Sequence, residues 1–552
     1  MRIFICFLFL FLCNFIFAQN FYLELSSLSE KEQQTIDSLS YQKTHPNPKS
    51  VTDQVGSFSK RLTKIGYLQN RSSNPQKIND STFTVLFSLG IKVDTIHIST
   101  SKVQYLKEMG IIESDSIIIP FSEIESFMNS IMQKLEVRGY SMSKIKLDNF
   151  WFDKNRLNAD LIEQISIQRQ LDDIVVLGYE KFPEGHKRQL KRMYKNRVFN
   201  QETLKDLHQD IQKMAFVNQV KSPEILFTKD STRVFVYLEK ARANNFDGYV
   251  GFTTDENEKV IFTGYLDLLL RNALNTGEQF KLYWKSDGND QQTFDFSGEL
   301  PYIFNSPVAL RGNLNIFKQD SIFQTTTTNL DLGYYFKYNT RAYLGYSSMS
   351  SNDIQSVNSA NLNDIESKFF TTTFEYFELN REDFLFPEKR NFIVKGGIGN
   401  RESSFGDNRQ FFVHLKGFTS FYMNENNIIH LKIDGHYLNS DSYVINELYR
   451  FGGINSIRGF NENSLQANFF SGMMLEYRYT LAPTMYVHSI TDFGYFQDKA
   501  TDINQNLLGL GFGFGLFTNN GLFNIVYANG SADGQEIKFS NSIIHLSFKA
   551  SF

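Results

Sequence analysis

An arginine close to three glycines marks the stretch of this sequence best suited to specific charge pairing. Residues 448–460 read Leu-Tyr-Arg-Phe-Gly-Gly-Ile-Asn-Ser-Ile-Arg-Gly-Phe, so that Arg458 follows Gly452 and Gly453 and precedes Gly459. Paired glycines permit positive φ angles and let the backbone approach a neighbouring wall closely. A guanidinium presents five donors in a fixed fork that matches a carboxylate. The stretch therefore predicts a loop that holds an arginine against an acidic partner, with an ordinary surface arginine as the alternative.

Two strand-like segments after this loop each carry one acidic residue. Residues 473–481 carry Glu476, and residues 485–495 carry Asp492. Odd positions of the first segment are apolar or aromatic, whereas Glu476 shares the other face with polar side chains. A charged side chain facing hydrocarbon is costly, at roughly 2–4 kcal/mol for a cation at the bilayer midplane. If these segments cross a membrane, both carboxylates must face the interior, where Arg458 could meet them.

The bulk composition excludes several classes of protein. The chain has 552 residues, too many for one ordinary domain, and its net charge of −4 gives no electrostatic reason to bind nucleic acid. Aromatic residues make up 15% while the mean hydropathy is −0.32, which is typical of strands with one apolar and one polar face. Beyond the first 18 residues no stretch has about 18 uninterrupted apolar residues, so we expect no spanning helix.

The N-terminus has the pattern of an export signal. An apolar run covers residues 3–17, and Ala18 offers a cleavage site, so residues 1–18 are predicted to be a signal peptide. A membrane anchor is the alternative, but the run is short for a spanning helix. A lipoprotein is disfavoured because a leucine, not a small residue, precedes Cys13. Cys6 and Cys13 both lie in this segment, so the mature protein should have no disulfide and no thiol chemistry.

The N-terminal third is predicted to contain three small α/β modules, here called module 1 (19–90), module 2 (91–171) and module 3 (172–241). Each has the order strand, helix, helix, strand, strand, or part of it, and such repetition indicates an array of similar units. One larger α/β domain is the alternative, but the short connections favour separate modules. The expected elements are 21–26, 29–41, 51–69 and 83–89 in module 1; 93–99, 102–110, 121–139, 144–152 and 161–167 in module 2; and 173–179, 184–194, 201–217, 224–228 and 233–239 in module 3.

Module 3 contains no group of residues that suggests an enzyme. His186 and His208 are isolated, and a lone histidine on a helix is usually solvated or structural. The helix predicted over 184–194 and the residues after it are rich in cations, which we interpret as a solvated face, with contact to acidic barrel turns or lipid head groups as the alternative. The cations are Lys187, Arg188, Lys191, Arg192, Lys195 and Arg197.

Residues 244–552 are predicted to form an antiparallel transmembrane β-barrel of sixteen strands. Helical patterns end here, strands of roughly 9 to 14 residues alternate with turns, and short joints alternate with longer ones. This count makes the Arg458 loop the sixth external loop. The expected strands are 245–253, 259–271, 278–286, 292–301, 306–318, 324–337, 340–348, 367–378, 390–400, 410–423, 427–439, 469–481, 485–497, 507–517, 521–528 and 538–552.

Two late strands have distinctive patterns. Four glycines alternate with apolar residues in a period of two, which excludes a nucleotide-binding loop because that motif opens a helix. We interpret them as a bare interior wall with room for the folded-in loop. They are Gly509, Gly511, Gly513 and Gly515. The last strand is amphipathic and ends in a phenylalanine, as in the sorting signals of outer-membrane proteins; its lipid-facing residues are predicted to be Ile544, Leu546, Phe548, Ala550 and Phe552.

Taken together, the motifs resemble those of the outer-membrane protein assembly superfamily of BamA- and TamA-like proteins, with a bacterial surface antigen type of barrel. The modules resemble POTRA domains. The motif Gly-Gly-x-x-x-Ile-Arg-Gly-Phe comprises Gly452, Gly453, Ile457, Arg458, Gly459 and Phe460, and Leu-Glu-Tyr-Arg and Thr-Asp-Phe-Gly follow at 475–478 and 491–494. In that family the loop folds back into the barrel and its arginine meets acidic residues on the inner wall. The resemblance implies Glu476 and Asp492 as the partners of Arg458.

The resemblance implies a non-enzymatic outer-membrane assembly factor without cofactor or metal. Its expected partners are the lipid bilayer, unfolded outer-membrane proteins, and periplasmic or lipoprotein partners, with the POTRA modules in the periplasm and no nucleic acid. Modules would add client strands to their sheet edges, and the seam between residues 247–253 and 543–552 would open laterally. A two-partner-secretion type of pore that exports a polypeptide is the alternative. A carrier of a surface enzyme would need a catalytic domain, and a passive porin would not explain the modules.

Overall fold

The computed structural model describes residues 20–153, 156–254, 260–287, 291–355, 362–381, 383–404, 406–518, 520–536 and 542–552. The predicted signal peptide, 1–18 with its cleavage site at Ala18, lies outside the described residues. The chain divides into two compact units. One contains the described residues up to Gln170 together with Val198–Glu202, and the other contains Leu171–Arg197 and Thr203–Phe552. Module 3, apart from Val198–Glu202, thus belongs to the same unit as the barrel, and modules 1 and 2 make up most of the other unit.

Module 1 is built around a parallel pair of strands, β1 and β5, whose alternate residues face two helices. Leu23 and Val85 on the strands and Phe58 on α3 are fully buried in one core. Three two-residue strands flank this pair and were not predicted, because two residues are too short to show a period. The elements are β1 (Phe21–Ser27), α2 (Glu30–Ser38), β2 (Thr44–His45), α3 (Pro48–Lys64), β3 (Arg71–Ser72), β4 (Gln76–Lys77) and β5 (Thr82–Ser88).

Module 2 has a four-stranded sheet in the order β7-β6-β9-β8. It differs from the prediction in two strands. β7 was missed because its short apolar run lies between two helices, and β9 begins at Arg156 rather than at 161, because its polar residues alternate with buried Leu157 and Ala159 along β6. The elements are β6 (Thr95–Ser99), α4 (Gln104–Glu108), β7 (Ser116–Pro120), η1 (Phe121–Glu123), α5 (Ile124–Val137), β8 (Lys144–Asp153) and β9 (Arg156–Gln164).

Module 3 has the predicted order of elements and a three-stranded sheet, β10-β12-β11. The second helix ends at Gln212 and not at 217. Its apolar spacing continues through Met214, but Val217 pairs with Lys240 on β12 and so begins a strand. The elements are β10 (Asp173–Leu177), α6 (Glu184–Tyr194), α7 (Gln201–Gln212), β11 (Val217–Phe227) and β12 (Thr232–Lys240).

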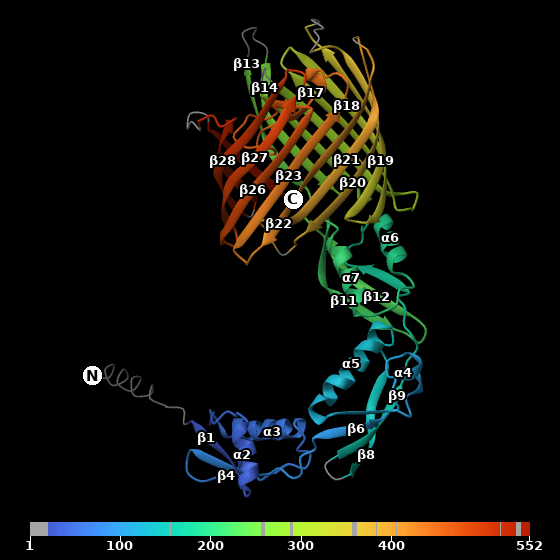
Figure 1. Cartoon of the computed structure of the whole chain (residues 1–552), viewed down its shortest axis with the longest axis vertical. Coiled ribbons are helices and arrows are strands. Elements are labelled where there is room, and N and C mark those ends of the chain that lie inside the picture. Colours follow the sequence, from blue (N-terminus) through green and yellow to red (C-terminus); the bar gives the residue numbers. More distant parts are fainter. Residues whose placement is uncertain are drawn as a thin grey trace, which may run out of the picture. The chain divides into compact units, whose positions relative to one another are not determined.

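The C-terminal part is a closed barrel of sixteen antiparallel strands (Figure 1). This confirms the predicted strand number, and the strand ends agree with the predicted ones to within about five residues. The strands are β13 (Asn245–Thr254), β14 (Val260–Arg271), β15 (Gln279–Asp287), β16 (Gln291–Ile303), β17 (Val308–Gln319), β18 (Phe323–Lys337), β19 (Thr340–Asp353), β20 (Ile365–Leu379), β21 (Glu388–Ser403), β22 (Asn408–Tyr422), β23 (Asn427–Asn439), β26 (Phe469–Ala482), β27 (Met485–Asp498), β28 (Ile503–Thr518), β29 (Gly521–Ala532) and β30 (Ile543–Ser551).

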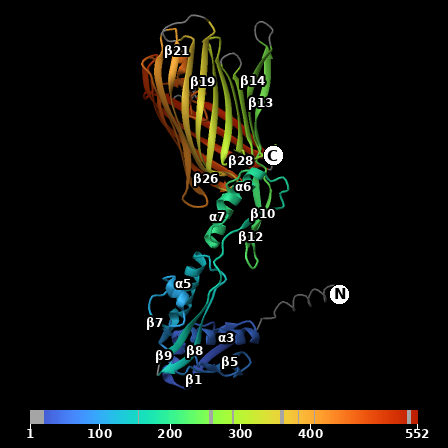
Figure 2. The same cartoon turned by 90° about the vertical axis from the view of Figure 1, so that its right-hand side faces the viewer.

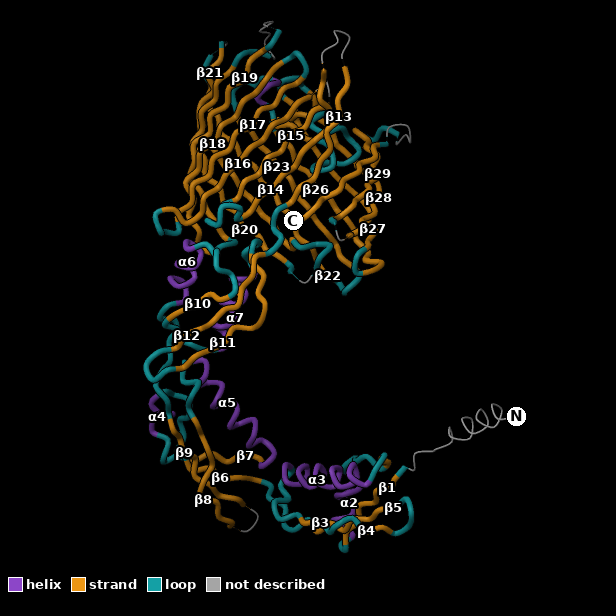
Figure 3. Tube along the Cα trace, turned by 180° about the vertical axis from the view of Figure 1, so that it is seen from behind, coloured by secondary structure: helices purple, strands orange, loops and turns teal. Residues whose placement is uncertain are grey.

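Module 3 lies beneath the end of the barrel at which the first and last strands meet (Figure 2). Helices α6 and α7 face the turns of this end, while the barrel wall itself consists of strands (Figure 3). Among the described residues, no helix is both long and apolar enough to cross a membrane. Outward-facing strand positions carry large exposed apolar side chains, such as Leu344, Phe370 and Ile398, whose exposure is 68–72%. Many interior positions carry polar or charged side chains, as the alternation predicted, but Phe470, Met474 and Phe496 form an apolar stretch of the interior wall.

Candidate functional site

The loop between β23 and β26, residues 440–468, folds into the barrel interior. It contains a short helical turn, η2 (Ile445–Glu447), and a two-stranded hairpin, β24 (Tyr449–Phe451) and β25 (Leu465–Ala467). Apolar residues of the hairpin and of the following turn pack on interior positions of three strands. Phe451 stacks on Phe470 of β26 with ring centroids 4.0 Å apart, and Ile457 is fully buried in the same cluster. This apolar contact holds the loop against the wall formed by β26, β27 and β28.

Glycines shape the turn that delivers the arginine. Gly452 and Gly453 have φ angles of +103° and +92°, which only glycine adopts without strain. Ser456 closes the turn by donating its N–H to the Gly453 carbonyl at 3.1 Å. The chain then runs along the wall through Ile457, Arg458 and Gly459.

Arg458 is nearly fully buried and bonds both predicted carboxylates. Its Nε and Nη2 donate to the two oxygens of Asp492 at 2.8 and 2.5 Å, and its backbone N–H donates to the same carboxylate at 2.9 Å. Its Nη1 donates to Glu476. The structure therefore brings together the three charged residues selected from the sequence, with a bidentate fork on Asp492.

The two carboxylates differ in how they are neutralised. Asp492 is fully buried, and Arg458 is its one charged partner among the described residues. Glu476 has a second cation, because Arg478 donates from Nε to its other oxygen at 2.7 Å. Loss of Arg458 would thus leave Asp492 without any counter-ion but Glu476 with one.

The glycine row of β28 has a different role from the predicted one at three of its four positions. Gly509 does lie against the loop, since a Cβ there would collide with the carbonyl oxygen of Arg458. Gly513 and Gly515 instead leave room for the rings of His488 and Tyr486, which are their direct cross-strand partners on β27. Gly511 faces the backbone of β29. The row accommodates large interior side chains of the neighbouring strand as well as the loop.

A contact that sequence reasoning missed involves the next glycine of the loop. Gly459 has a φ of +88°, and its backbone touches that of Asn529 and Gly530 on β29, so neither glycine has room for a Cβ. Phe460, the last motif residue, is packed beside the same apolar cluster. Nothing in the local sequence of 529–530 indicates this contact, because only the fold brings the two backbones together.

Three further ties between the loop and the wall were not predicted. Glu447 forms a buried ion pair with Arg401 of β21, with 2.5 Å between Nη1 and Oε1. Tyr449 donates its hydroxyl to Asp434 of β23 at 3.1 Å. Glu462 accepts from the hydroxyl of Tyr283 at 3.0 Å and from Nζ of Lys285 at 2.7 Å, both on β15. The loop is therefore fixed to several sides of the interior.

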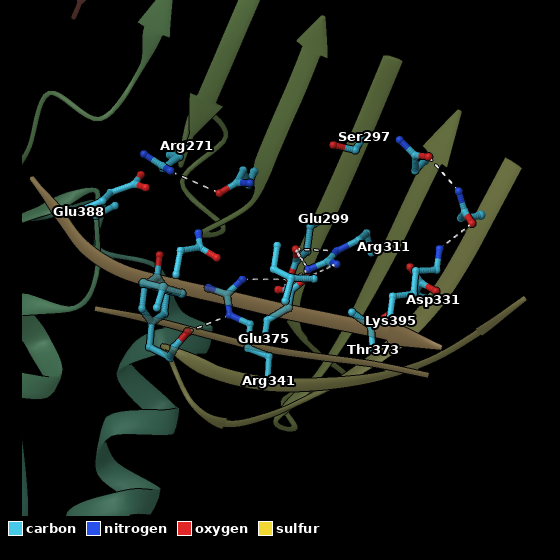
Figure 4. Close-up of a pocket in the computed structure, with 18 of the residues that line it drawn as sticks. Arg271, Ser297, Glu299, Arg311, Asp331, Arg341, Thr373, Glu375, Glu388 and Lys395 are labelled. Carbon is cyan, nitrogen blue, oxygen red and sulfur yellow. Dashed lines mark hydrogen bonds and ion pairs between the residues drawn. The ribbon is translucent and has the colours of Figure 1, made fainter. Parts of the chain in front are cut away.

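A second charged network lines a cavity of about 410 Å³ at the end of the interior near module 3 (Figure 4). Arg311 forms a bidentate pair with Glu375 at 2.6 and 2.9 Å and also donates to Glu299 at 2.9 and 3.0 Å. Arg341 lies 3.4 Å from the other oxygen of Glu299. These charged residues alternate with outward apolar residues along their strands, so their inward direction was predictable from the sequence. The residues with which they form ion pairs were not predictable.

Module 3 is joined to the barrel through a buried histidine. His186 of α6 is fully buried, and its ring lies 4.6 Å from that of Tyr302 on β16 and 5.0 Å from that of Phe216. Burial, and secondarily the nearby Arg341, lowers the pKa of His186 to about 3. His186 is thus structural rather than solvated. Of the basic cluster around it, Arg188 contacts Asn305 on a barrel turn, whereas other cations pair within the module.

The turn between β20 and β21, residues 380–387, forms the second part of this joint. Nε of Arg381 donates to the carbonyl of Gln212 at the end of α7 at 3.0 Å. From the same turn, Phe386 enters the barrel and packs on Tyr486, with ring centroids 4.7 Å apart, below Arg478. Module 3 and the barrel therefore share a buried aromatic contact at His186 and Tyr302, with polar contacts of Arg381 and Arg188 around it.

The barrel closes over very few residues. β13 pairs with β30 through Asn245–Ser551, Phe246–Ala550 and Asp247–Lys549, three pairs, whereas β13 and β14 share ten. Beyond these, residues 244 and 552 exchange two backbone hydrogen bonds of 3.0 and 3.3 Å. Within the described backbone, the stretch of β13 from Gly248 to Thr254 has no partner in β30. In β30 itself Ile544, Leu546 and Phe548 point outward, at 42–64% exposure, and Phe552 is 54% exposed.

The fold and site together define a class: a sixteen-stranded barrel with an inserted arginine loop, preceded by modules resembling POTRA domains. Residues 272–543 match the Omp85 superfamily domain. The barrel part of this chain belongs to the Omp85 superfamily. Across the described residues, no cluster of His, Cys, Asp and Glu could hold a metal ion.

Solved structures of similar fold cover most of the chain. CdiB from Acinetobacter baumannii is 14% identical, covers 90% of this chain and 97% of its own, and superposes with a TM-score of 0.51. CdiB from Escherichia coli is 12% identical, with 90% and 98% covered and a TM-score of 0.51. BamA from Haemophilus ducreyi lacking POTRA domains 1–3 is 16% identical, with 82% and 99% covered and a TM-score of 0.47. At these identities the likeness shows the fold alone. No curated protein matches the chain.

Proposed function

We propose that this protein is an outer-membrane assembly factor of the Omp85 superfamily, which accepts unfolded barrel proteins in the periplasm and inserts them into the membrane through its seam. Insertion or export of polypeptides at the outer membrane is the general function of this superfamily. The proposal places the modules in the periplasm and residues 440–468 on the external side. Module boundaries at residues 90, 171 and 241 are part of the proposal.

The observation that carries the proposal is the short seam. A closed barrel normally leaves no unpaired strand edge. In the part of the backbone that the structure describes, β13 and β30 share three pairs, which leave residues 248–254 of β13 without a partner in β30. An unpaired edge is a template for a further strand, and an incoming client strand could extend it by main-chain hydrogen bonding. A pore that exports a polypeptide through its interior has no need of such an edge.

The contents of the interior also support insertion over export. The Arg458 loop crosses the interior, and Phe386 enters it from the other end. Export would require displacement of both.

Depletion of the protein followed by quantitative proteomics of the outer membrane tests the proposal. Broad loss of barrel proteins from the membrane, with their unfolded forms accumulating in the periplasm, is the expected result. Loss of one secreted polypeptide with normal levels of barrel proteins would contradict it and favour the export pore. The client proteins, and any periplasmic or lipoprotein partner, would be identified by crosslinking in the same cells.

A further inference from the structure

The folded-in loop contacts both flanks of the seam. On one flank it touches the last strands of the barrel: Arg458 bonds Asp492 on β27, and Gly459 lies on the backbone of Gly530 on β29. On the other flank Glu462 bonds Tyr283 and Lys285 on β15, the third strand of the barrel. In the order of the barrel, only β30, β13 and β14 lie between β29 and β15. The seam itself falls within this interval.

The separation of β29 and β15 is compatible with residues 459–462 running straight from one flank of the seam to the other. Three residues after Gly459 the chain reaches Glu462, and three residues can span at most about 10 Å. Four inter-strand steps along the wall correspond to roughly 19 Å. The curvature of the barrel shortens this path, and the long side chains of Glu462 and Lys285 cover the remainder. Residues 459–462 thus pass directly beneath the seam.

The crossing lies level with the part of the seam that lacks backbone pairs. Tyr283 is in register with Asp267 on β14, which is in register with Asp247, the last paired residue of β13. Lys285 is in register with Tyr265 and so with residue 249, beyond the last pair. The two residues of β15 that bind Glu462 therefore lie level with the last pair between β13 and β30 and with the unpaired part of β13 just beyond it.

We propose that residues 458–462 form an interior strap that holds the seam closed, and that Glu462 is its releasable end. The strap would compensate for the missing pairs between β13 and β30. Its two ends differ in strength. Arg458 and Asp492 are buried and share three hydrogen bonds, whereas the side chains of Glu462 and Lys285 are each 23% exposed. Lys285 also has Asp287 as a second partner at 3.5 Å, so release of Glu462 does not leave a bare charge.

This inference rests on the proposed function for its purpose, since a releasable strap is useful to a seam that opens. Whether residues 458–462 hold the seam closed can be tested without client proteins. Opening of the seam can be measured on the purified full-length protein in lipid nanodiscs by hydrogen exchange with mass spectrometry of peptides from β13 and β30. A result there stands whether or not depletion in cells affects barrel proteins.

The test compares Glu462→Gln with a matched variant of the same loop, Glu447→Gln. Both remove one carboxylate that binds the wall, but Glu447 binds Arg401 on β21, away from the seam. We expect Glu462→Gln to speed exchange of the β13 and β30 peptides by about tenfold, equivalent to 1.4 kcal/mol, and Glu447→Gln to leave it within about twofold. Lys285→Met should reproduce the effect of Glu462→Gln, and the double variant should add little to either.

A second readout separates opening of the seam from release of the whole loop. Ser456→Cys places a thiol at a buried loop position, in a mature chain predicted to have no other cysteine. Its labelling by a soluble maleimide should remain slow in Glu462→Gln, because Arg458 still holds the loop, and should become fast in Arg458→Ala. Seam exchange that is equal in wild type and Glu462→Gln, or that rises equally in Glu447→Gln, would overturn the strap.

Discussion

Replacing Arg458 by alanine is the sharpest perturbation that the structure suggests. Among the residues that the structure describes, Arg458 is the one charged partner of fully buried Asp492 and one of the two arginines paired with Glu476. Arg458→Ala removes the three side-chain donors but keeps the backbone N–H that binds Asp492. The loop backbone and its glycines are unchanged. The variant therefore tests the charge pairing and not the turn geometry.

The size of the effect follows from burial. An exposed ion pair contributes about 0–1 kcal/mol, whereas removing one partner of a buried pair costs roughly 3–5 kcal/mol because the other charge is left uncompensated. Asp492 is 0% exposed, so the larger range applies to Arg458→Ala. Asp492→Asn should cost a similar amount, because it leaves Arg458 with only a shared carboxylate.

The assay is the temperature at which the folded barrel loses its mobility shift on semi-native gels, combined with maleimide labelling of Ser456→Cys. Arg458→Ala should lower that temperature, speed labelling and impair assembly of barrel proteins in cells. Arg458→Lys should restore the temperature only in part, since an ammonium cannot form the bidentate fork. The double variant Arg458→Ala with Asp492→Asn should be less than additive. Equal heat resistance and equal labelling in wild type and Arg458→Ala would refute the argument.

Three other predictions concern the seam, the module 3 joint and the modules. Phe246 and Ala550 form a cross-strand pair at the seam. A disulfide between Phe246→Cys and Ala550→Cys should abolish assembly of barrel proteins until a reductant is added. Full assembly activity of the oxidised double variant would contradict lateral opening. Docking of module 3 should weaken below pH 6.5, because buried His186, with its pKa near 3, stays neutral whereas an undocked histidine is protonated. The free energy of docking should fall by about 2 kcal/mol at pH 5. Thermal melts that depend on pH equally in wild type and His186→Leu would exclude this cause. A fragment of residues 20–241 should be soluble with mixed helix and strand content but should bind a hydrophobic dye through the exposed joint around Phe216; a disordered or purely β circular dichroism spectrum would contradict its folding.

Period-two patterns made the barrel predictable, and three short motifs made its loop recognisable. Strands such as β26 alternate outward Met473 and Tyr477 with interior Met474 and Glu476, so both strand number and the inward direction of the charges could be read from the sequence. The position of Arg458 between its carboxylates was accessible only by resemblance. Its distances, and the unequal neutralisation of Asp492 and Glu476, required coordinates.

Contacts between distant segments were not predictable. Glu462 and Lys285 are 177 residues apart, and neither has a neighbour in sequence that indicates a partner. The sequence left His186 as either solvated or structural, and only the fold shows that Tyr302 of β16 packs against it. Short strands were missed for another reason. β7 and the start of β9 are defined by pairing with β6, and pairing between strands leaves no periodic signal in five residues.

The close packing of the loop on β28 and β29 has a consequence for how the sequence can change over evolutionary time. Gly459, Gly509 and Gly530 come from three segments, and at each of them a Cβ would collide with the backbone of another. A second substitution cannot relieve such a collision, because every backbone is the same size. The three glycines should therefore be kept or lost together. Homologues that keep the loop inside the barrel should have all three, and homologues in which one is replaced should also have other residues at the remaining two positions.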